Sequence, residues 1–486
     1  LRRIAEGTPL LVLIDDVQWA DEDTSRALVE LLKDQHPPAM LLLLGSRPDD
    51  STPVIAELFG ASGGRAVIEA ARVTVDLEPL DETATLALIR AELHAGARGD
   101  LQAMMHDDLV ATLAREAHGN PFAACELARF VREEEGDFEA GVVGRSIDEI
   151  VVKRADGLDA AARELLDVIA VSGEPTEERI LRRSAGLSAD DRASTDTLRA
   201  KLWIRSLRSG SATLLDAVHD RVRESIASVL PAPRRAAIHG ALALALEATE
   251  SPAHDRLARH FAAAGEASLA HHHALVASEE ARASLALRRS ADLLGLAIEL
   301  ATDAQRAELM PRYAQALADA GLFERCAEAW DRAADLTTGT ERHAHRRRAA
   351  EAWLYAGRID HGLDLLERIA GKTGLRVAKN RYLALAQTVW QRILLRLRGF
   401  STRPRALSDI PARELERLAT LRAVTIAYTT LDQIRGAMIH ARWLRAALDA
   451  GHIEDARLAL AFEGGLAAVS SSPRGRDLAL KALSVL

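Results

Sequence analysis

A pattern of small and large apolar residues recurs at a spacing of 36 residues in the C-terminal half of the chain. The three sets are Ala291, Leu294, Ala297 and Leu300, then Ala327, Trp330, Ala333 and Leu336, then Leu363, Leu366 and Ile369. Steps of three residues place each set on one face of a helix, and alanines suit positions where two helices cross closely. A repeat of this length holds one helix pair, which cannot bury its apolar face alone. The pattern therefore predicts stacked helix pairs.

The spacing resembles that of tetratricopeptide (TPR) repeats, whose unit is about 34 residues. This resemblance implies a TPR-like α-solenoid over residues 236–486 that binds protein partners. The proline that usually closes a TPR unit is missing, so a generic helical bundle stays open as an alternative. The 486 residues are 48% hydrophobic but only 4% aromatic, and they are rich in the helix formers Ala and Leu. We therefore expect a mainly α-helical chain.

The N-terminal residues show a different pattern, in which strand and helix signals alternate. Leu10–Ile14 is a continuous apolar run that leads into two acidic residues, Asp15 and Asp16. Met40–Leu44 is a second apolar run, a helix is expected at 23–33 between them, and a third strand is expected at Val73–Leu77. Such alternation predicts an α/β part with a buried parallel sheet, whose carboxyl edge carries the acid pair.

From Asp81 onward the pattern is almost entirely helical. We divide the chain into an α/β core at 1–80, a helical lid at 81–145, a third domain at 146–235 and the repeats at 236–486. Gly119-Asn120-Pro121 interrupts a helical run, because Gly ends helices and Pro suits their first turn. A small hairpin is expected around 209–211. The apolar segment 383–397 predicts a buried helix with arginines reaching solvent, the alternative being a helix on a membrane surface.

The string Asp-Asp-Val-Gln-Trp-Ala-Asp at 15–21 resembles the Walker B segment of STAND/AAA-type signalling ATPases. The resemblance implies that Asp15 holds Mg²⁺ on ATP, since this hard cation prefers oxygen ligands. It implies that Asp16 orients the attacking water. Ser46 and Arg47 follow the second strand and take the place of the residues that sense the γ-phosphate, where an arginine could neutralise developing charge. The alternatives are a buried strand that ends at a helix N-cap and an ordinary surface arginine.

The string His118-Gly119-Asn120-Pro121-Phe122 resembles the G-x-P motif of the same family. The resemblance places Asn120 and Pro121 at the bound nucleotide, with the proline near the adenine, where it couples nucleotide state to the next domain. Residues 146–230 resemble the winged-helix-like domain that follows in this family. Within it, residues 218–224 resemble an H-D-R-[IV]-R-E string of bacterial proteins that join a serine/threonine kinase, this ATPase and TPR-like repeats. For His219, capping of a helix is favoured over catalysis.

The phosphate-binding loop G-x-x-x-x-G-K-[ST] is absent from these 486 residues. Only nine residues precede Leu10, so we expect a polypeptide that begins within its nucleotide-binding domain. ATP carries several negative charges. The carboxylates of Asp15 and Asp16 repel these charges unless a Mg²⁺ ion lies between the carboxylates and the phosphates. We therefore expect this chain alone to bind ATP no tighter than about millimolar, roughly −4 kcal/mol, and to be inactive. The family's missing P-loop strand would lie between 40–44 and 73–77, which should leave a gap there.

The function expected from these resemblances is an ATP- and Mg²⁺-dependent signalling ATPase, cytoplasmic, with a repeat array for protein partners. The alternatives are a LuxR-type ATP-dependent transcription regulator and a non-catalytic TPR-like scaffold. A net charge of −9 argues against DNA binding by this chain, and no apolar run is long enough to span a membrane. The cysteines Cys125 and Cys326 are too few for a disulfide framework and fit a reducing compartment. No kinase motif occurs in these residues.

Overall fold

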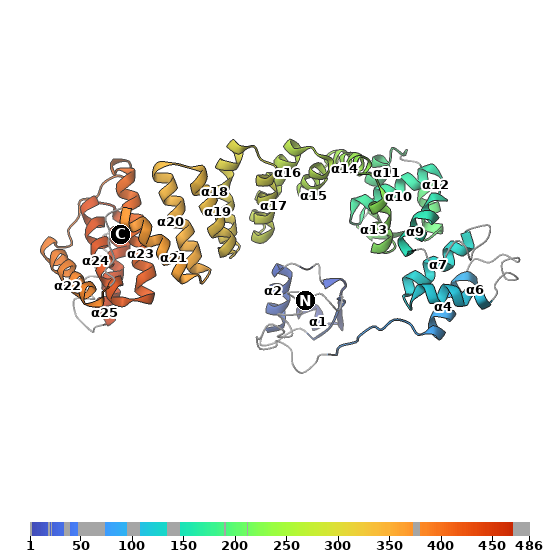
Figure 1. The fold of residues 1–486 in the computed structure, drawn as a ribbon, viewed down its shortest axis with the longest axis horizontal. Helices are drawn as coiled ribbons and strands as arrows, with labels where there is room; N and C mark the ends of the chain where they lie inside the picture. Colours follow the sequence, from blue (N-terminus) through green and yellow to red (C-terminus); the bar gives the residue numbers. More distant parts are fainter. Residues whose placement is uncertain are drawn as a thin grey trace. The chain divides into compact units, whose positions relative to one another are not determined.

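The computed structural model describes residues 2–17, 20, 22–33, 39–46, 73–94, 107–133, 146–188, 191–210, 212–372 and 380–469. These residues are mostly helical, with a small α/β part at the N-terminus (Figure 1). The chain divides into two compact units. The first holds residues 1–253 and 263–265, and the second holds 254–262 and everything from 266 onward.

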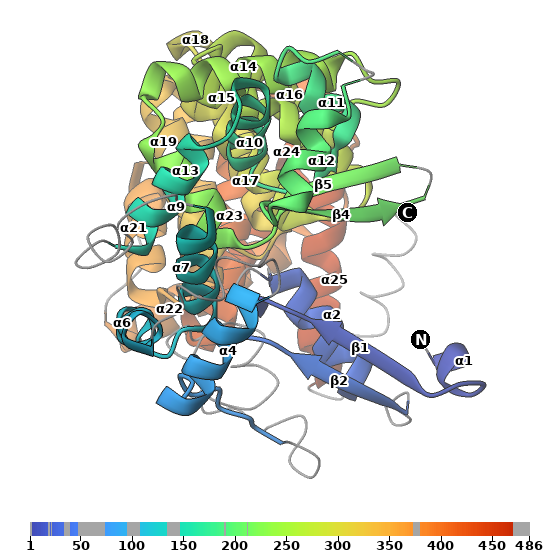
Figure 2. The ribbon, with the colours of Figure 1, turned by 90° about the vertical axis from the view of Figure 1, so that its right-hand side faces the viewer.

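Within its described residues, the α/β part contains a short helix α1 (Arg2–Ala5), two strands and a longer helix α2 (Glu22–Lys33). Strands β1 (Leu10–Ile14) and β2 (Met40–Leu44) run parallel, with Leu10 opposite Met40 and Ile14 opposite Leu44. They lie side by side in Figure 2. The two strands and the helix between them confirm the expected alternation of strand and helix.

The sequence predicted that both faces of these strands are buried, but only one face is covered in the described structure. Leu44 packs against the helix side chains Val29, Leu28 and Leu32, so one face of the pair is covered. The opposite face carries Leu11, Leu13, Leu41 and Leu43, which are 44–68% exposed. Successive side chains on a strand point to opposite faces, so a continuous apolar run is buried on both sides only where both faces are covered. Among the described residues one face lacks such a cover.

The prediction of a third strand at Val73–Leu77 is wrong. Residues 73–80 are extended but form no strand, and Val73, Val75 and Leu77 are all exposed. An apolar segment becomes a strand only when a neighbour supplies hydrogen-bond partners, and within the described ranges β2 pairs with β1 rather than with 73–77. Residues 40–44 and 73–77 are not paired with each other in the described ranges, and the gap expected between them stays a prediction.

Three helices pack together in the described ranges 82–94 and 107–133, namely α4 (Glu82–His94), α6 (Asp107–Ala117) and α7 (Pro121–Glu133). Their apolar faces meet in one core that includes Ile89, Leu113, Leu127 and Phe130. The next helix, α9 (Ile147–Asp156), adds Ile150 to this core and begins with a capping box between Ser146 and Glu149. The lid helices and the following residues therefore share a packed contact.

Residues 147–229 continue with helices, a short strand, two further helices and a hairpin. The elements are α10 (Ala160–Ser172), β3 (Thr176–Glu177), α11 (Glu178–Ser184), α12 (Ala193–Ala200), β4 (Ile204–Ser209), β5 (Ala212–Ala217) and α13 (Asp220–Val229). The sheet is antiparallel in the order β3-β5-β4. Strands β4 and β5 form the expected hairpin at Gly210 (Figure 2). Trp203 is fully buried in the core beneath it. Helix α14 (Ala232–Glu247) follows.

The repeats have a period of 36 residues in their helix boundaries as well as in their sequence. Helices α16 (Ala267–Ala283), α18 (Asp303–Asp319) and α20 (Gly339–Tyr355) begin 36 residues apart, and so do α17 (Leu287–Glu299), α19 (Phe323–Leu336) and α21 (Ile359–Lys372). Connections of two or three residues join them, so neighbours are antiparallel (Figure 1). Ala291, Ala327, Trp330 and Leu366 are at most 4% exposed. Helix α15 (His254–Ala264) precedes them.

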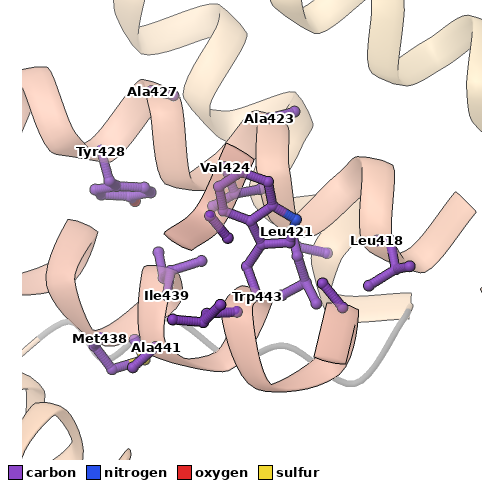
Figure 3. Packing of buried hydrophobic residues seen from close by; sticks show 14 of the residues in the cluster. Leu418, Leu421, Ala423, Val424, Ala427, Tyr428, Met438, Ile439, Ala441 and Trp443 are labelled. Atoms are coloured by element: carbon purple, nitrogen blue, oxygen red, sulfur yellow. The ribbon is translucent and has the colours of Figure 1, made fainter. Parts of the chain in front are cut away.

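The last described helices are α22 (Arg381–Arg398), α23 (Ala412–Leu431), α24 (Gln433–Ala450) and α25 (Ile453–Val469), with a 3₁₀ turn at Leu407–Asp409. Helices α23 and α24 pack around the fully buried Trp443, against which Leu421 and Val424 lie (Figure 3). The expected burial of the segment 383–397 is only partly right. Leu395 is buried, but Val389, Trp390 and Leu397 are more than half exposed.

No helix in the described part of the chain is both long enough and apolar enough to cross a membrane.

Candidate functional site

The carboxyl ends of β1 and β2 lie side by side and bring together three of the expected site residues. Asp15 and Asp16 follow Ile14, and Gly45 and Ser46 follow Leu44, which is the register partner of Ile14. Asp15, Asp16 and Ser46 are exposed at this edge. In parallel sheets ligands bind outside the carboxyl ends of the strands, so these polar groups stand where a ligand would approach.

Backbone hydrogen bonds fix the two strand ends against each other. The amide of Gly45 donates to the carbonyl of Ile14 at 2.9 Å, and the amide of Val17 donates to the carbonyl of Gly45 at 2.9 Å. Asp15 Oδ1 accepts the amide of Asp16 at 3.0 Å. Asp16 has φ of 52°, a left-handed conformation that Asp and Asn tolerate better than most residues. The chain therefore turns sharply at Asp16, directly after the strand.

Gly45 leaves the space that the Asp15 carboxylate occupies. A Cβ atom at position 45 would stand 2.4 Å from Asp15 Oδ1, far inside van der Waals contact. A glycine at the end of β2 therefore allows Asp15 to hold its present orientation.

The donor set at this edge fits Mg²⁺ that arrives with a nucleotide. Magnesium is usually bound through one or two carboxylates, with phosphate oxygens and waters completing the octahedron. Asp15 offers an exposed carboxylate whose Oδ1 is oriented by an amide, which meets that requirement. Across the described ranges no three His, Cys, Asp or Glu side chains gather into a metal site of their own.

Several expected residues lie outside the described ranges. These are Arg47, the proposed partner of the γ-phosphate, and Gln18, Trp19 and Asp21 of the Walker B-like string. Their roles stay predictions.

Asn120 and Pro121 lie at the start of α7. The side chain of Asn120 accepts the amide of Ala123 at 3.1 Å, while its backbone amide donates to the carbonyl of Ala117 and its backbone carbonyl accepts the amide of Ala124. Pro121 is exposed in the first turn, where its missing amide costs nothing. Both residues therefore have a helix-start role in the described part of the chain, and their placement at a nucleotide stays a prediction.

The glycine of the same turn packs closely on the segment that follows the α/β part. Gly119 has φ of 72°, and its carbonyl accepts the amide of Leu80 at 2.8 Å. A Cβ atom at 119 would stand 2.5 Å from the carbonyl oxygen of Leu80 and 2.9 Å from Pro79. The turn is thus a contact point for the chain where it enters the lid helices.

The two remaining motifs contact each other. Phe122, the last residue of the G-x-P-like string, stacks on His219 with ring centroids 4.4 Å apart. His219 is the N-cap of α13, and its Nδ1 accepts the amide of Arg221 at 3.1 Å. The interpretation of His219 as a capping residue is confirmed.

Arg221 of the same string holds α9. It makes a bidentate ion pair with Asp148, with both distances 2.8 Å, and Asp148 also accepts the hydroxyl of Ser225 at 2.5 Å. Although partial burial raises the pKa of Asp148, hydrogen bonds from Ser225 and Arg221 outweigh this and lower it. The string at 218–224 therefore serves as a clamp between α13, α9 and the start of α7.

A buried ion-pair network links the lid helices to the next domain, and the sequence analysis missed it. Glu126 on α7 binds Arg154 on α9 at 2.7 Å, and both side chains are 1% exposed. Glu126 also binds Arg129 at 2.7 Å, which in turn reaches Glu92 of α4 at 2.8 Å. Arg154 donates to the carbonyl of Lys201 and lies over the ring of Trp203. The sequence did contain one signal for this network, because Glu126 is the only acidic residue in the largely apolar run 122–131.

The two cysteines are free. Burial raises the pKa of Cys326 to about 11, so its thiol is protonated and unreactive at neutral pH.

Comparisons with known proteins found a likeness in structure but none in sequence. No family model matches the chain, and no curated protein sequence matches it. Among solved structures, it is similar to a signal transduction ATPase with numerous domains (STAND) protein with a tetratricopeptide repeat sensor from Pyrococcus horikoshii. The TM-score is 0.43 and the identity is 14%, over 98% of this chain and 62% of that chain. At this level the likeness does not assign a function.

Proposed function

We propose that the chain is part of an ATP-dependent signalling ATPase of the STAND type, in which a nucleotide switch is joined to a TPR-like array. The observation that carries the proposal is the edge formed by β1 and β2. A parallel pair in register presents Asp15 and Asp16 beside Gly45 and Ser46, in the order expected of a Walker B strand and its sensor neighbour.

Each residue of this edge has a distinct part in the proposal. Asp15 would hold the waters of Mg²⁺, and Gly45 keeps its carboxylate in place. Asp16 would orient the water that attacks the γ-phosphate, while Ser46 and Arg47 would meet the γ-phosphate from the neighbouring strand. When bound, Mg²⁺ supplies charge neutralisation at the phosphates. Asn120 and Pro121, at the start of α7, are proposed to contact the bound nucleotide and to couple its state to the next domain.

The lid and the third domain offer a route for the signal. Phe122 stacks on His219 directly after Pro121, and Glu126 binds Arg154 four residues later. A movement of the start of α7 therefore acts on α13 and α9 together. The order helix, strand, two helices and hairpin over 160–217, with sheet order β3-β5-β4, supports a winged-helix-like domain here.

The repeat array is proposed to bind protein partners or to hold the switch inactive. Its support is the 36-residue period shared by helix starts and buried alanines. A kinase domain elsewhere in the parent protein, and a cytoplasmic location, are part of the same proposal.

The test is to read the coding DNA upstream of the Leu1 codon. We expect an apolar strand followed by G-x-x-x-x-G-K-[ST], which would supply the lysine and the amide cradle that the phosphates require. A continuous upstream reading frame without this motif would contradict the proposal. A kinase domain further upstream, or a helix-turn-helix downstream of Leu486, would separate the kinase-linked parent from a LuxR-type regulator.

A further inference from the structure

Three arginines gather beside a small cavity between α23 and α24. Arg417 lies near the start of α23, and Arg442 and Arg445 lie one helical turn apart on α24. The cavity has a volume of about 120 Å³, and its floor is formed by Leu418, Leu421 and Ala446. Leu418 and Leu421 are seen in Figure 3 on the α23 side of the Trp443 core. The three arginines thus line one space between two helices that pack against each other.

The positive charge of this cavity is not balanced by its carboxylates. Glu414 and Asp449 also line it, and Asp449 is held by Arg398 at 2.7 Å. Among the described residues Arg417 and Arg445 form no ion pair, in contrast to Arg392 and Arg398, which pair with Glu463 and Asp449. Three arginines therefore line the cavity with two carboxylates, and one of these carboxylates is already paired with Arg398 outside the cavity lining.

The arginines act on one another. Partial burial of Arg442, together with repulsion from Arg417 and Arg445, lowers the pKa of its guanidinium. Like charges held close on a folded surface destabilise it, and a bound anion converts this repulsion into attraction. Arginine is suited to this because its planar fork binds oxyanions through two parallel hydrogen bonds.

We propose that this cavity binds a phosphate group, either as the free anion or as the end of a small phosphate ester. Three arginines that line one small cavity match a multiply charged tetrahedral oxyanion better than a single carboxylate. A second cavity of about 640 Å³ shares Glu414 and Arg417 with the first and is lined in addition by apolar atoms of Ile369 and Pro411. It has room for the body of an ester. This inference concerns the repeat array and does not depend on the proposed nucleotide switch.

The experiment measures the melting temperature of the full chain with inorganic phosphate and with sodium chloride at the same ionic strength. At about ten times its dissociation constant, phosphate should raise Tm by about 3 °C over the chloride control. The variants Arg417→Gln and Arg445→Gln should lose at least half of this rise. Without phosphate both should melt at or above the wild-type temperature, because repulsion is relieved. Loss of a merely structural arginine would instead lower Tm.

Arg332→Gln is the matched control, since Arg332 is an exposed helical arginine for which the structure describes no ion pair. It should keep the full phosphate effect. The proposal is overturned if phosphate acts no more strongly than chloride, if Arg445→Gln keeps the full effect, or if Arg332→Gln loses as much. Phenyl phosphate identifies the source: binding about tenfold tighter than inorganic phosphate assigns the site to an ester, and equal binding assigns it to the free anion.

Discussion

At the scale of single residues, the edge of the two-stranded sheet depends on a glycine. Gly45 has ordinary backbone angles, so its value lies in the space it leaves for the Asp15 carboxylate. The sequence alone pointed to the acids, because five apolar residues lead into two carboxylates and Trp-Ala-Asp follows at 19–21. It did not indicate Gly45, since a contact between neighbouring strands appears only once their register is known.

Gly45→Ala should impair nucleotide chemistry while leaving the fold intact. The new Cβ would displace the end of the short Asp15 side chain, which costs at most about 1 kcal/mol of stability. In a polypeptide with the complete nucleotide site, ATP hydrolysis should fall about tenfold or more, because the Mg²⁺ ligand is misplaced. Gly7→Ala is the control, since a Cβ there meets nothing closer than 3.8 Å. Equal rates for both variants would contradict the role given to Gly45.

The buried pair Glu126–Arg154 should contribute strongly to stability. Glu126→Gln leaves Arg154 buried without a counter-charge, which should lower the free energy of unfolding by about 3 kcal/mol. Urea denaturation measures this. The double variant Glu126→Leu with Arg154→Met should recover part of the loss, because neither buried charge remains. Glu116→Gln on α6 is the control, because Glu116 has no ion pair among the described residues, and it should change the free energy of unfolding by less than about 0.5 kcal/mol. If Glu116→Gln lowered the free energy of unfolding as much as Glu126→Gln, the buried pair would have no special role.

At the scale of elements, the local motifs turned out to be joints between helices. The string at 218–224 begins α13 and ties it to α9 through Arg221 and Asp148. Sequence patterns gave the helix start and the hairpin, because capping residues and Gly210 act locally. The ion pair between residues 73 positions apart could not be predicted from spacing, since it depends on how the helices pack.

Asp148 should make stability depend on pH in the acid range. Its folded-state pKa is lowered, so its contribution is fully present above the ordinary Asp value of about 4 and is lost as pH falls through the folded-state pKa. Asp148→Asn should therefore cost about 1 kcal/mol at pH 7 and little at pH 2. Thermal melts at both pH values measure the difference, with exposed Asp76→Asn as the control. An equal loss at both pH values would show that ionisation of Asp148 is irrelevant.

The repeat period should also be testable through its alanines. Ala327 is fully buried where α19 packs on its neighbours. Ala327→Leu should destabilise the array by about 1–3 kcal/mol, because three extra carbon atoms must enter a packed core. Ala283→Leu, at an exposed position of α16, is the matched control and should change stability little. Chemical denaturation followed by circular dichroism measures both; equal stabilities would mean that the 36-residue alanines do not mark helix contacts.

At the scale of the whole molecule, the sequence predicted best those features that follow from residue composition and from the repeat period. The helical array followed from apolar residues every 36 positions, and its helices start at that period. Errors arose where burial depends on distant partners: 73–77 is not a strand, and one side of α22 is exposed. In both cases the apolar pattern was read correctly, but a pattern does not say whether a covering element is present.

The division into two compact units suits a switch joined to a receiver. The first unit holds the strand ends, the lid helices and the clamp at His219, and the second holds the repeats with their arginine cavity. In this view nucleotide chemistry and ligand recognition reside in separate units.

The most direct test is ATP hydrolysis by a longer polypeptide that carries the phosphate-binding loop proposed upstream of Leu1. Asp16→Asn removes the carboxylate proposed to orient the attacking water while keeping the size of the side chain, and the rate should fall by about 10²–10⁴-fold. Asp76→Asn makes the same chemical change at an exposed position and should leave the rate unchanged. A wild-type rate in Asp16→Asn would show that the end of β1 is not a catalytic edge, and the proposed nucleotide switch would have to be abandoned.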